Sequence, residues 1–75
     1  MGTNLIASAI AKIMAYGVLG PAIAIGMIGA AAVVAIARNP QASSKIQITM
    51  LIAIAFAEAV AIYVLVVALI LKFAA

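Results

Sequence analysis

Arg38-Asn39-Pro40-Gln41 is the polar cluster that decides the fold, because long apolar stretches lie on both sides of it. Pro40 pushes the residue before it out of the helical conformation, so a turn is expected at Asn39. Residues 13–37 carry no charged side chain, and residues 46–71 carry one. Each stretch exceeds the roughly 20 residues that a helix needs to cross about 30 Å of hydrocarbon. The sequence predicts an all-α membrane protein, folded as an antiparallel hairpin of two transmembrane helices.

One unit is expected over residues 1–75, because a chain of this length has room for a single small fold. Its expected segments are a first helix over about 4–37, a polar loop over about 38–42 and a second helix over about 43–73. Ser43 and Ser44 are expected to cap the second helix. The first helix has roughly 33 residues, or about 50 Å, so we expect it to project beyond the hydrocarbon.

The composition excludes most soluble functions. Apolar residues make up 72% of the chain, and four basic side chains and one acid give a net charge of +3. These charges are too few and too scattered for nucleic-acid binding. The chain has no cysteine, hence no disulfide, thiolate nucleophile or cysteine-based metal site. No catalytic residue, metal site, cofactor or cleaved signal segment is expected.

Small residues crowd the middle of the first helix. Gly20 and Ala24 are four residues apart, as are Ala22 and Gly26, so each pair shares a face of the helix. More than one face is therefore narrow, and a single partner helix cannot cover them all. We expect a homo-oligomer in which this helix packs against copies of itself, with a local bend at Pro21.

Glu58 is the only acidic residue and lies at the middle of the second apolar stretch. An acid at bilayer depth is a functional candidate, because a charged carboxylate is costly there. Its neighbours three and four residues away are all apolar, so the protonated form is expected against lipid or protein. Counted from Pro40, it lies level with Ala22 and is expected to face the small residues of the first helix. The alternative is a purely structural hydrogen-bonding group.

Other polar side chains are given lesser roles. Tyr63 either joins a hydrogen-bond network with the Glu58 carboxyl or points toward the polar edge of the bilayer. Thr49 is expected to bond back to its own helix. Lys12 and Lys72 lie at the end opposite the loop and are expected to reach the lipid headgroups.

Three motifs together resemble the c subunit of F-type ATP synthase: Gly20–Gly26, Ala37–Pro40 and Phe56–Ala59. The resemblance spans essentially the whole chain. It implies a ring of identical hairpins in a lipid bilayer, with the first helix inside and Glu58 as the proton carrier. Each Glu58 gives up its proton near an arginine of the stator a subunit. The polar loop, from Arg38 to Gln41, contacts the gamma and epsilon subunits of the central stalk. The chain itself is then not an enzyme.

The sequence departs from this family at Ala22 and Ala24, where the family has glycines, which affects the expected ring size. Sodium-transporting relatives have a glutamine and a hydroxyl residue where this chain has Ile25 and Ala59. Protons are therefore the expected ion. Sodium remains an alternative, because Tyr63 matches a tyrosine of some sodium-binding members.

Two further alternatives belong to other classes of membrane protein. A small pore-forming protein of the holin kind is also short, apolar and oligomeric, but it needs no lone acid at mid-membrane. A vacuolar-type ring usually has duplicated four-helix chains. The positive charges at the two ends of the hairpin balance, so charge does not orient it. The resemblance alone implies a bacterial inner membrane, with the loop in the cytoplasm and both termini outside.

Overall fold

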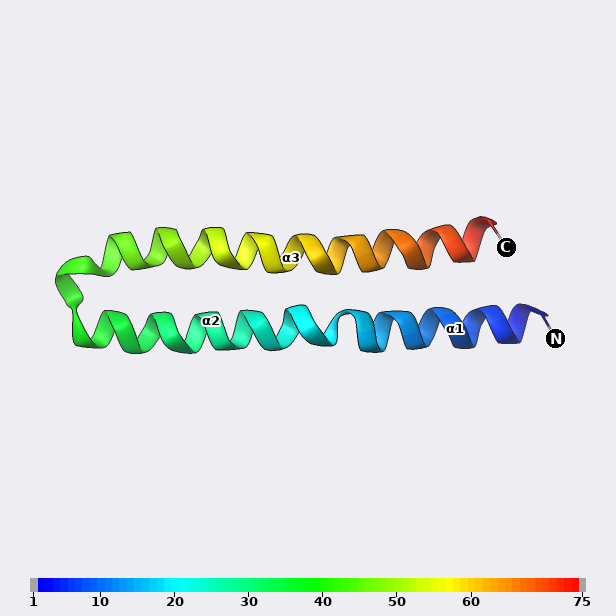
Figure 1. Cartoon of the computed structure of the whole chain (residues 1–75), viewed down its shortest axis with the longest axis horizontal. Coiled ribbons are helices and arrows are strands. Elements are labelled where there is room, and N and C mark those ends of the chain that lie inside the picture. The colour runs from blue at the N-terminus through cyan, green and yellow to red at the C-terminus, as the bar shows by residue number, and fades with distance from the viewer. Residues whose placement is uncertain (1, 75) are drawn as a thin grey trace.

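The structure is a computed structural model that describes residues 2–74. The chain forms one antiparallel helical hairpin, with its two ends at the same end of the molecule (Figure 1). The first arm consists of α1 (Gly2–Gly17) and α2 (Leu19–Arg38), and the second arm is α3 (Ser43–Ala74). Both α1 and α2 pack along α3. The hairpin of two long apolar helices predicted from the sequence is confirmed.

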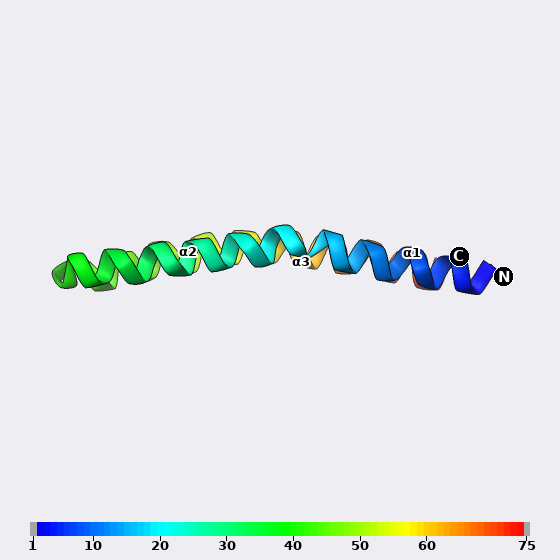
Figure 2. The ribbon, with the colours of Figure 1, turned by 90° about the horizontal axis from the view of Figure 1, so that it is seen from below.

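The first arm is interrupted at Val18, where the sequence predicts one helix with a bend at Pro21. Val18 has φ −91° and ψ −9°, and its N–H still donates to the carbonyl of Met14 at 3.1 Å. Pro21 has no N–H to donate to the Gly17 carbonyl, and its ring crowds that preceding turn. The disturbance therefore lies one turn before the proline. Figure 2 shows that the two arms are bowed together in this region.

The turn between the arms is short and helical in character. The Asn39 N–H donates to the Ala35 carbonyl at 2.9 Å, which closes α2. A 3-10 turn, η1 (Pro40–Ala42), leads directly into α3. Pro40 opens this helical run because its fixed φ suits a first helical position. Ser43 already has helical φ and ψ, so the predicted capping by Ser43 and Ser44 is wrong.

The hairpin has almost no interior. Among the described residues only Pro21, Ala32 and Ala68 are buried, the two alanines at 7% and 4% exposure. Its extents are 59 × 16 × 8 Å, which is one helix deep. Both arms are long and apolar enough to cross a membrane, and only 6% of an 18-residue apolar stretch in each is buried. A lipid bilayer or further protein must therefore cover the remaining apolar surface.

The arms lie close together at Gly17. A Cβ at this position would overlap the Val64 side chain, whose Cγ2 is 3.0 Å from it. Gly17 thus lets α1 lie directly against α3, and it fixes the register of the arms. Further along α3, the Thr49 hydroxyl donates to the Lys45 carbonyl at 2.9 Å, which confirms the predicted bond within its own helix.

Candidate ion-binding site

Glu58 lies on α3, midway between the charged residues that bound its apolar span. It is 13 residues from Lys45 and 14 from Lys72, or about 20 Å along the helix in either direction. Counting six residues toward the loop from both Gly17 and Val64 places Glu58 level with Ile23. The small-residue stretch from Gly20 to Gly26 therefore lies at the same depth as the carboxyl.

The Glu58 side chain is nevertheless exposed and does not point at the first arm. Ala57, which precedes it, is half-buried and faces α2. Because successive residues are about 100° apart round a helix, Glu58 projects from one flank of the hairpin. Its surroundings are therefore supplied from outside the single chain.

The four small residues at this depth differ in direction. Gly20, Ala22 and Gly26 are exposed, whereas Ala24 is half-buried against α3. A Cβ added at Gly20 or Gly26 would meet nothing within 4 Å. The hairpin thus does not bring Glu58 against Gly20, Ala22 or Gly26, and any contact between them must form between copies.

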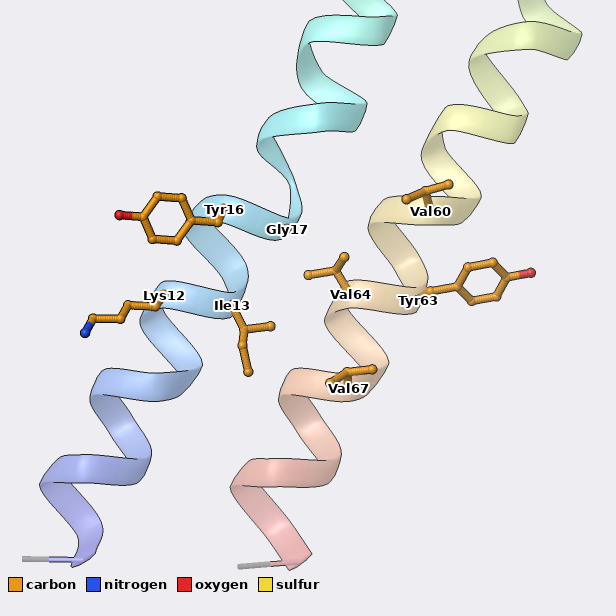
Figure 3. Close-up of a pocket in the computed structure, with 8 residues that line it drawn as sticks. All are labelled: Lys12, Ile13, Tyr16, Gly17, Val60, Tyr63, Val64 and Val67. Carbon is orange, nitrogen blue, oxygen red and sulfur yellow. The ribbon is translucent and has the colours of Figure 1, made fainter.

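Tyr63 lies on the flank opposite to Glu58. Measured from Ala57, Glu58 is about 100° round α3 in one direction, and Tyr63 is about 120° in the other. The Tyr63 side chain is 68% exposed and points away from α1 (Figure 3). Within one hairpin, its hydroxyl cannot join the Glu58 carboxyl.

A groove of about 600 Å³ lies beside Tyr63, on the terminal half of the hairpin. It is lined by Lys12, Ile13, Tyr16, Gly17, Val60, Tyr63, Val64 and Val67 (Figure 3). Glu58 is not among these residues. The groove therefore belongs to the surface of the hairpin and not to the surroundings of the carboxyl.

The predicted loop residues are all exposed at the turn: Arg38, Asn39, Pro40 and Gln41. The turn lies at one extremity of the elongated molecule (Figure 1). The backbone N–H groups of Asn39 and Ala42 donate hydrogen bonds within it, to the carbonyls of Ala35 and Asn39. These four residues are thus presented together, far from the carboxyl.

A long helical hairpin with apolar surfaces and one carboxylic acid at mid-span defines the class: a small integral membrane protein that carries an ionisable group at bilayer depth. The family model for the ATP synthase C subunit matches residues 6–71. The chain belongs to this family, as its three motifs predict. It is therefore a non-catalytic, ion-carrying component of the rotor ring of an F-type ATP synthase, and the holin-like alternative is not retained.

Curated relatives support this assignment, and all three described here are ATP synthase c subunits. The ATP synthase subunit c 1 of Pelobacter propionicus is 56% identical over 61 residues, which cover 81% of this chain and 67% of the relative. The c subunit of Chloroflexus aurantiacus is 44% identical over 72 residues, which cover 96% of this chain and 92% of the relative. The ATP synthase subunit c 1 of Syntrophotalea carbinolica is 51% identical over 61 residues, which cover 81% of this chain and 69% of the relative. The comparison with solved structures gave no match.

Proposed function

We propose that Glu58 carries one proton per copy across the membrane, and that this movement turns a ring of identical hairpins. The observation that carries the proposal is the position of the only acid in the chain, exposed on a flank at mid-span. A charged carboxylate at this depth costs several kcal/mol, so the side chain crosses lipid in its neutral form. A cation close to it favours release of the proton. An arginine of the stator a subunit supplies that cation.

The shape of the hairpin supports a ring. Its two flat flanks differ, since Glu58 lies on one and Tyr63 on the other, so copies associate head to tail. Gly20, Gly26 and Gly29 have open space where a side chain would lie, although glycine within a helix costs about 1 kcal/mol relative to alanine. A neighbouring helix that packs closely against them accounts for this composition.

Head-to-tail association also gives Tyr63 a role. With the Glu58 flank of one copy against the Tyr63 flank of the next, the hydroxyl and the carboxyl approach from different chains. They are five residues apart along α3, about 7.5 Å in height, and because all copies of a closed ring lie at one height, the two side chains themselves must span this distance. The hydroxyl then donates a hydrogen bond to the carboxyl and steadies the occupied site.

The surroundings of Glu58 favour protons over sodium. A sodium ion needs several oxygen ligands in place of its water. The residues one turn from Glu58 are Ile54, Ala55, Ala61 and Ile62, and none carries a side-chain oxygen. Tyr63 offers one hydroxyl, which is the observation in favour of sodium as the second candidate. A single hydroxyl and one carboxylate are a poor ligand set for sodium and a sufficient one for a proton.

The polar loop and the orientation complete the proposal. Arg38, Asn39, Pro40 and Gln41 are exposed at the tip of the hairpin and form the surface on which the gamma and epsilon subunits of the central stalk stand. The loop then lies in the cytoplasm of a bacterium and both termini lie outside its inner membrane. The bacterial relatives support this location.

The proposal is tested by the rate at which a carbodiimide modifies Glu58 in detergent-solubilised rings, measured across pH with and without sodium. The reagent requires the protonated acid, so the rate follows proton occupancy. For a proton carrier, the rate is expected to fall only at high pH and to be unaffected by sodium. Glu58→Gln is the matched control and should not react. Protection by millimolar sodium would show instead that the ring transports sodium.

A further inference from the structure

Gln47 lies on the same flank of the hairpin as Glu58. The two residues are 11 apart on α3, which is three turns with about 20° left over, so their side chains leave the helix in nearly the same direction. Gln47 is exposed in the single hairpin. It lies roughly 16 Å from Glu58 along the helix, close to the edge of a hydrocarbon layer about 30 Å thick. An amide that apolar protein covers at this depth costs free energy unless it is hydrogen-bonded.

Lys45 and Thr49 lie on the opposite flank, together with Tyr63. Lys45 is 18 residues from Tyr63, which is five full turns, and Thr49 is one turn from Lys45. Both side chains are exposed, and both line a groove of about 460 Å³ between α2 and α3. The Thr49 hydroxyl donates to the Lys45 carbonyl at 2.9 Å, which fixes its oxygen and leaves that oxygen free to accept. This flank therefore offers a donor and an acceptor one helical turn apart.

The three side chains match in height. Gln47 is two residues from Lys45 in one direction and two from Thr49 in the other, about 3 Å along the axis in each case. Side chains on a helix lean toward its N-terminus, so all three lean the same way and keep this spacing. Because all copies of a closed ring lie at one height, Gln47 of one copy lies between the heights of Lys45 and Thr49 of the next. An amide is both acceptor and donor, so its oxygen suits the lysine and its nitrogen suits the threonine.

Lys45 has no acidic partner within its own chain. Glu58, the only acid, is 13 residues away, about 20 Å along α3, and lies on the other flank. The long stem of Lys45 lets its ammonium reach either a lipid headgroup or the next copy. Gln47 is shorter and lies on the flank that a neighbouring copy covers, so its partner comes from that copy. The hydrogen-bonding need of the Gln47 amide therefore favours the contact between copies.

We propose that Lys45 and Thr49 of each copy clasp Gln47 of the next. The Lys45 ammonium donates to the amide oxygen, and the amide nitrogen donates to the Thr49 hydroxyl. The inference rests on the proposed ring, whose head-to-tail order brings the two flanks together, but not on the ion that Glu58 carries. Hydrogen bonds are directional, whereas apolar contacts are not, so this clasp sets the height of each copy against the next.

The test changes the charges at the clasp and follows the dissociation of the purified ring in a denaturing detergent by native mass spectrometry. Gln47→Leu is expected to raise the dissociation rate about threefold, the effect of one hydrogen bond between membrane helices. Gln47→Lys places two ammonium groups together and is expected to raise the rate about tenfold. Adding Lys45→Glu in the same chain is expected to restore the wild-type rate, because the two charges then attract. Residues two apart do not face each other on one helix, so this rescue must act between copies.

Lys72→Glu is the matched control for the rescue. It makes the same change of net charge at the other end of α3, so it is expected to leave the rate of Gln47→Lys unchanged. Equal rescue by Lys72→Glu would show a general effect of charge and would overturn the clasp. Wild-type rates in both Gln47→Leu and Gln47→Lys would also overturn it, and would show that Lys45 serves lipid headgroups instead.

Cysteines at positions 65 and 67 separate the clasp from the ring. Leu65 is seven residues from Glu58 and lies on its flank, whereas Val67 lines the groove beside Tyr63. With both Leu65→Cys and Val67→Cys in each chain, a short bismaleimide is expected to link copies into a ladder on a denaturing gel. Such links without rescue by Lys45→Glu would overturn the clasp and leave the ring standing. No links would overturn the head-to-tail arrangement and the clasp with it.

Discussion

At the scale of single residues, the direction of the Glu58 side chain matters as much as its depth. The carboxyl lies at mid-span but projects from a flank, so the hairpin provides only the helix that holds it. Whatever lies against that flank decides its protonation: lipid and a neighbouring copy favour the neutral acid, and a cation favours the carboxylate. Under the proposed function, this dependence on the surroundings lets a single side chain bind a proton in one place and release it in another.

Replacing Glu58 by glutamine is expected to abolish proton movement while leaving assembly intact. The amide has nearly the same shape as the carboxylic acid, but it has no titratable proton. Proton uptake by vesicles that contain the complete ATP synthase measures the first effect, and the size of the purified ring measures the second. Glu58→Asp keeps an acid on a shorter side chain and is expected to retain part of the activity. Normal proton-coupled ATP synthesis in Glu58→Gln would disprove the carrier role.

At the scale of helices, the contact between α1 and α3 depends on one glycine. Gly17 lies where a side chain would overlap Val64. The interruption at Val18 follows immediately, because Pro21 leaves the Gly17 carbonyl without its usual donor. Close packing and the local break therefore occur in the same turn of the helix.

The Gly17→Ala substitution is expected to destabilise the hairpin by about 1–3 kcal/mol, because it overpacks this contact. Val64→Ala in the same chain is expected to restore most of the loss by making room for the new methyl group. A double-mutant cycle on the denaturant-induced dissociation of the purified ring measures the coupling. Gly20→Ala is the control, since a Cβ there meets nothing within the hairpin. Additive effects of Gly17→Ala and Val64→Ala would contradict the contact.

The elements that hydropathy controls could be predicted from the sequence, and those that local geometry controls could not. The two arms and the turn follow from apolar length and from Pro40. Counting residues from Pro40 places Glu58 level with Ala22, and the register set by Gly17 and Val64 gives Ile23. Counting gives depth but not direction round the helix, so it could not predict that Glu58 lies on an exposed flank. The break lies at Val18 and not at Pro21, because a proline acts on the turn before it.

At the scale of the whole molecule, a hairpin one helix deep has surfaces but no core. Its large apolar side chains are mostly exposed, Phe56 at 73% and Leu51 at 60% among them. Lipid covers those that point outward, and neighbouring copies are expected to cover the flanks. The stability of the fold then resides in the assembly more than in the individual chain.

Gly20→Leu is expected to prevent assembly without changing the hairpin. Gly20 is exposed with open space around it in the single chain, so the larger side chain fits there, but it blocks a neighbouring helix at that flank. Circular dichroism should show unchanged helix content, while native mass spectrometry should show loss of the oligomer. Leu19→Trp enlarges an exposed side chain on the side of α2 turned away from α3 and is expected to assemble normally. A Gly20→Leu ring of wild-type size would show that this flank is not a contact between copies.

The thinness of the hairpin also affects how many ions the proposed rotor moves per revolution. In a closed ring of n hairpins, neighbouring copies are rotated by 360°/n relative to each other. Each hairpin is only one helix deep, so the volumes of a few flank side chains set that angle. Every hairpin contributes one Glu58, so n is also the number of ions that the proposed rotor moves per revolution. Ala24 faces α3, but Ala22 is exposed, so the methyl group that it carries in place of the family's glycine can alter the number of ions moved in each turn.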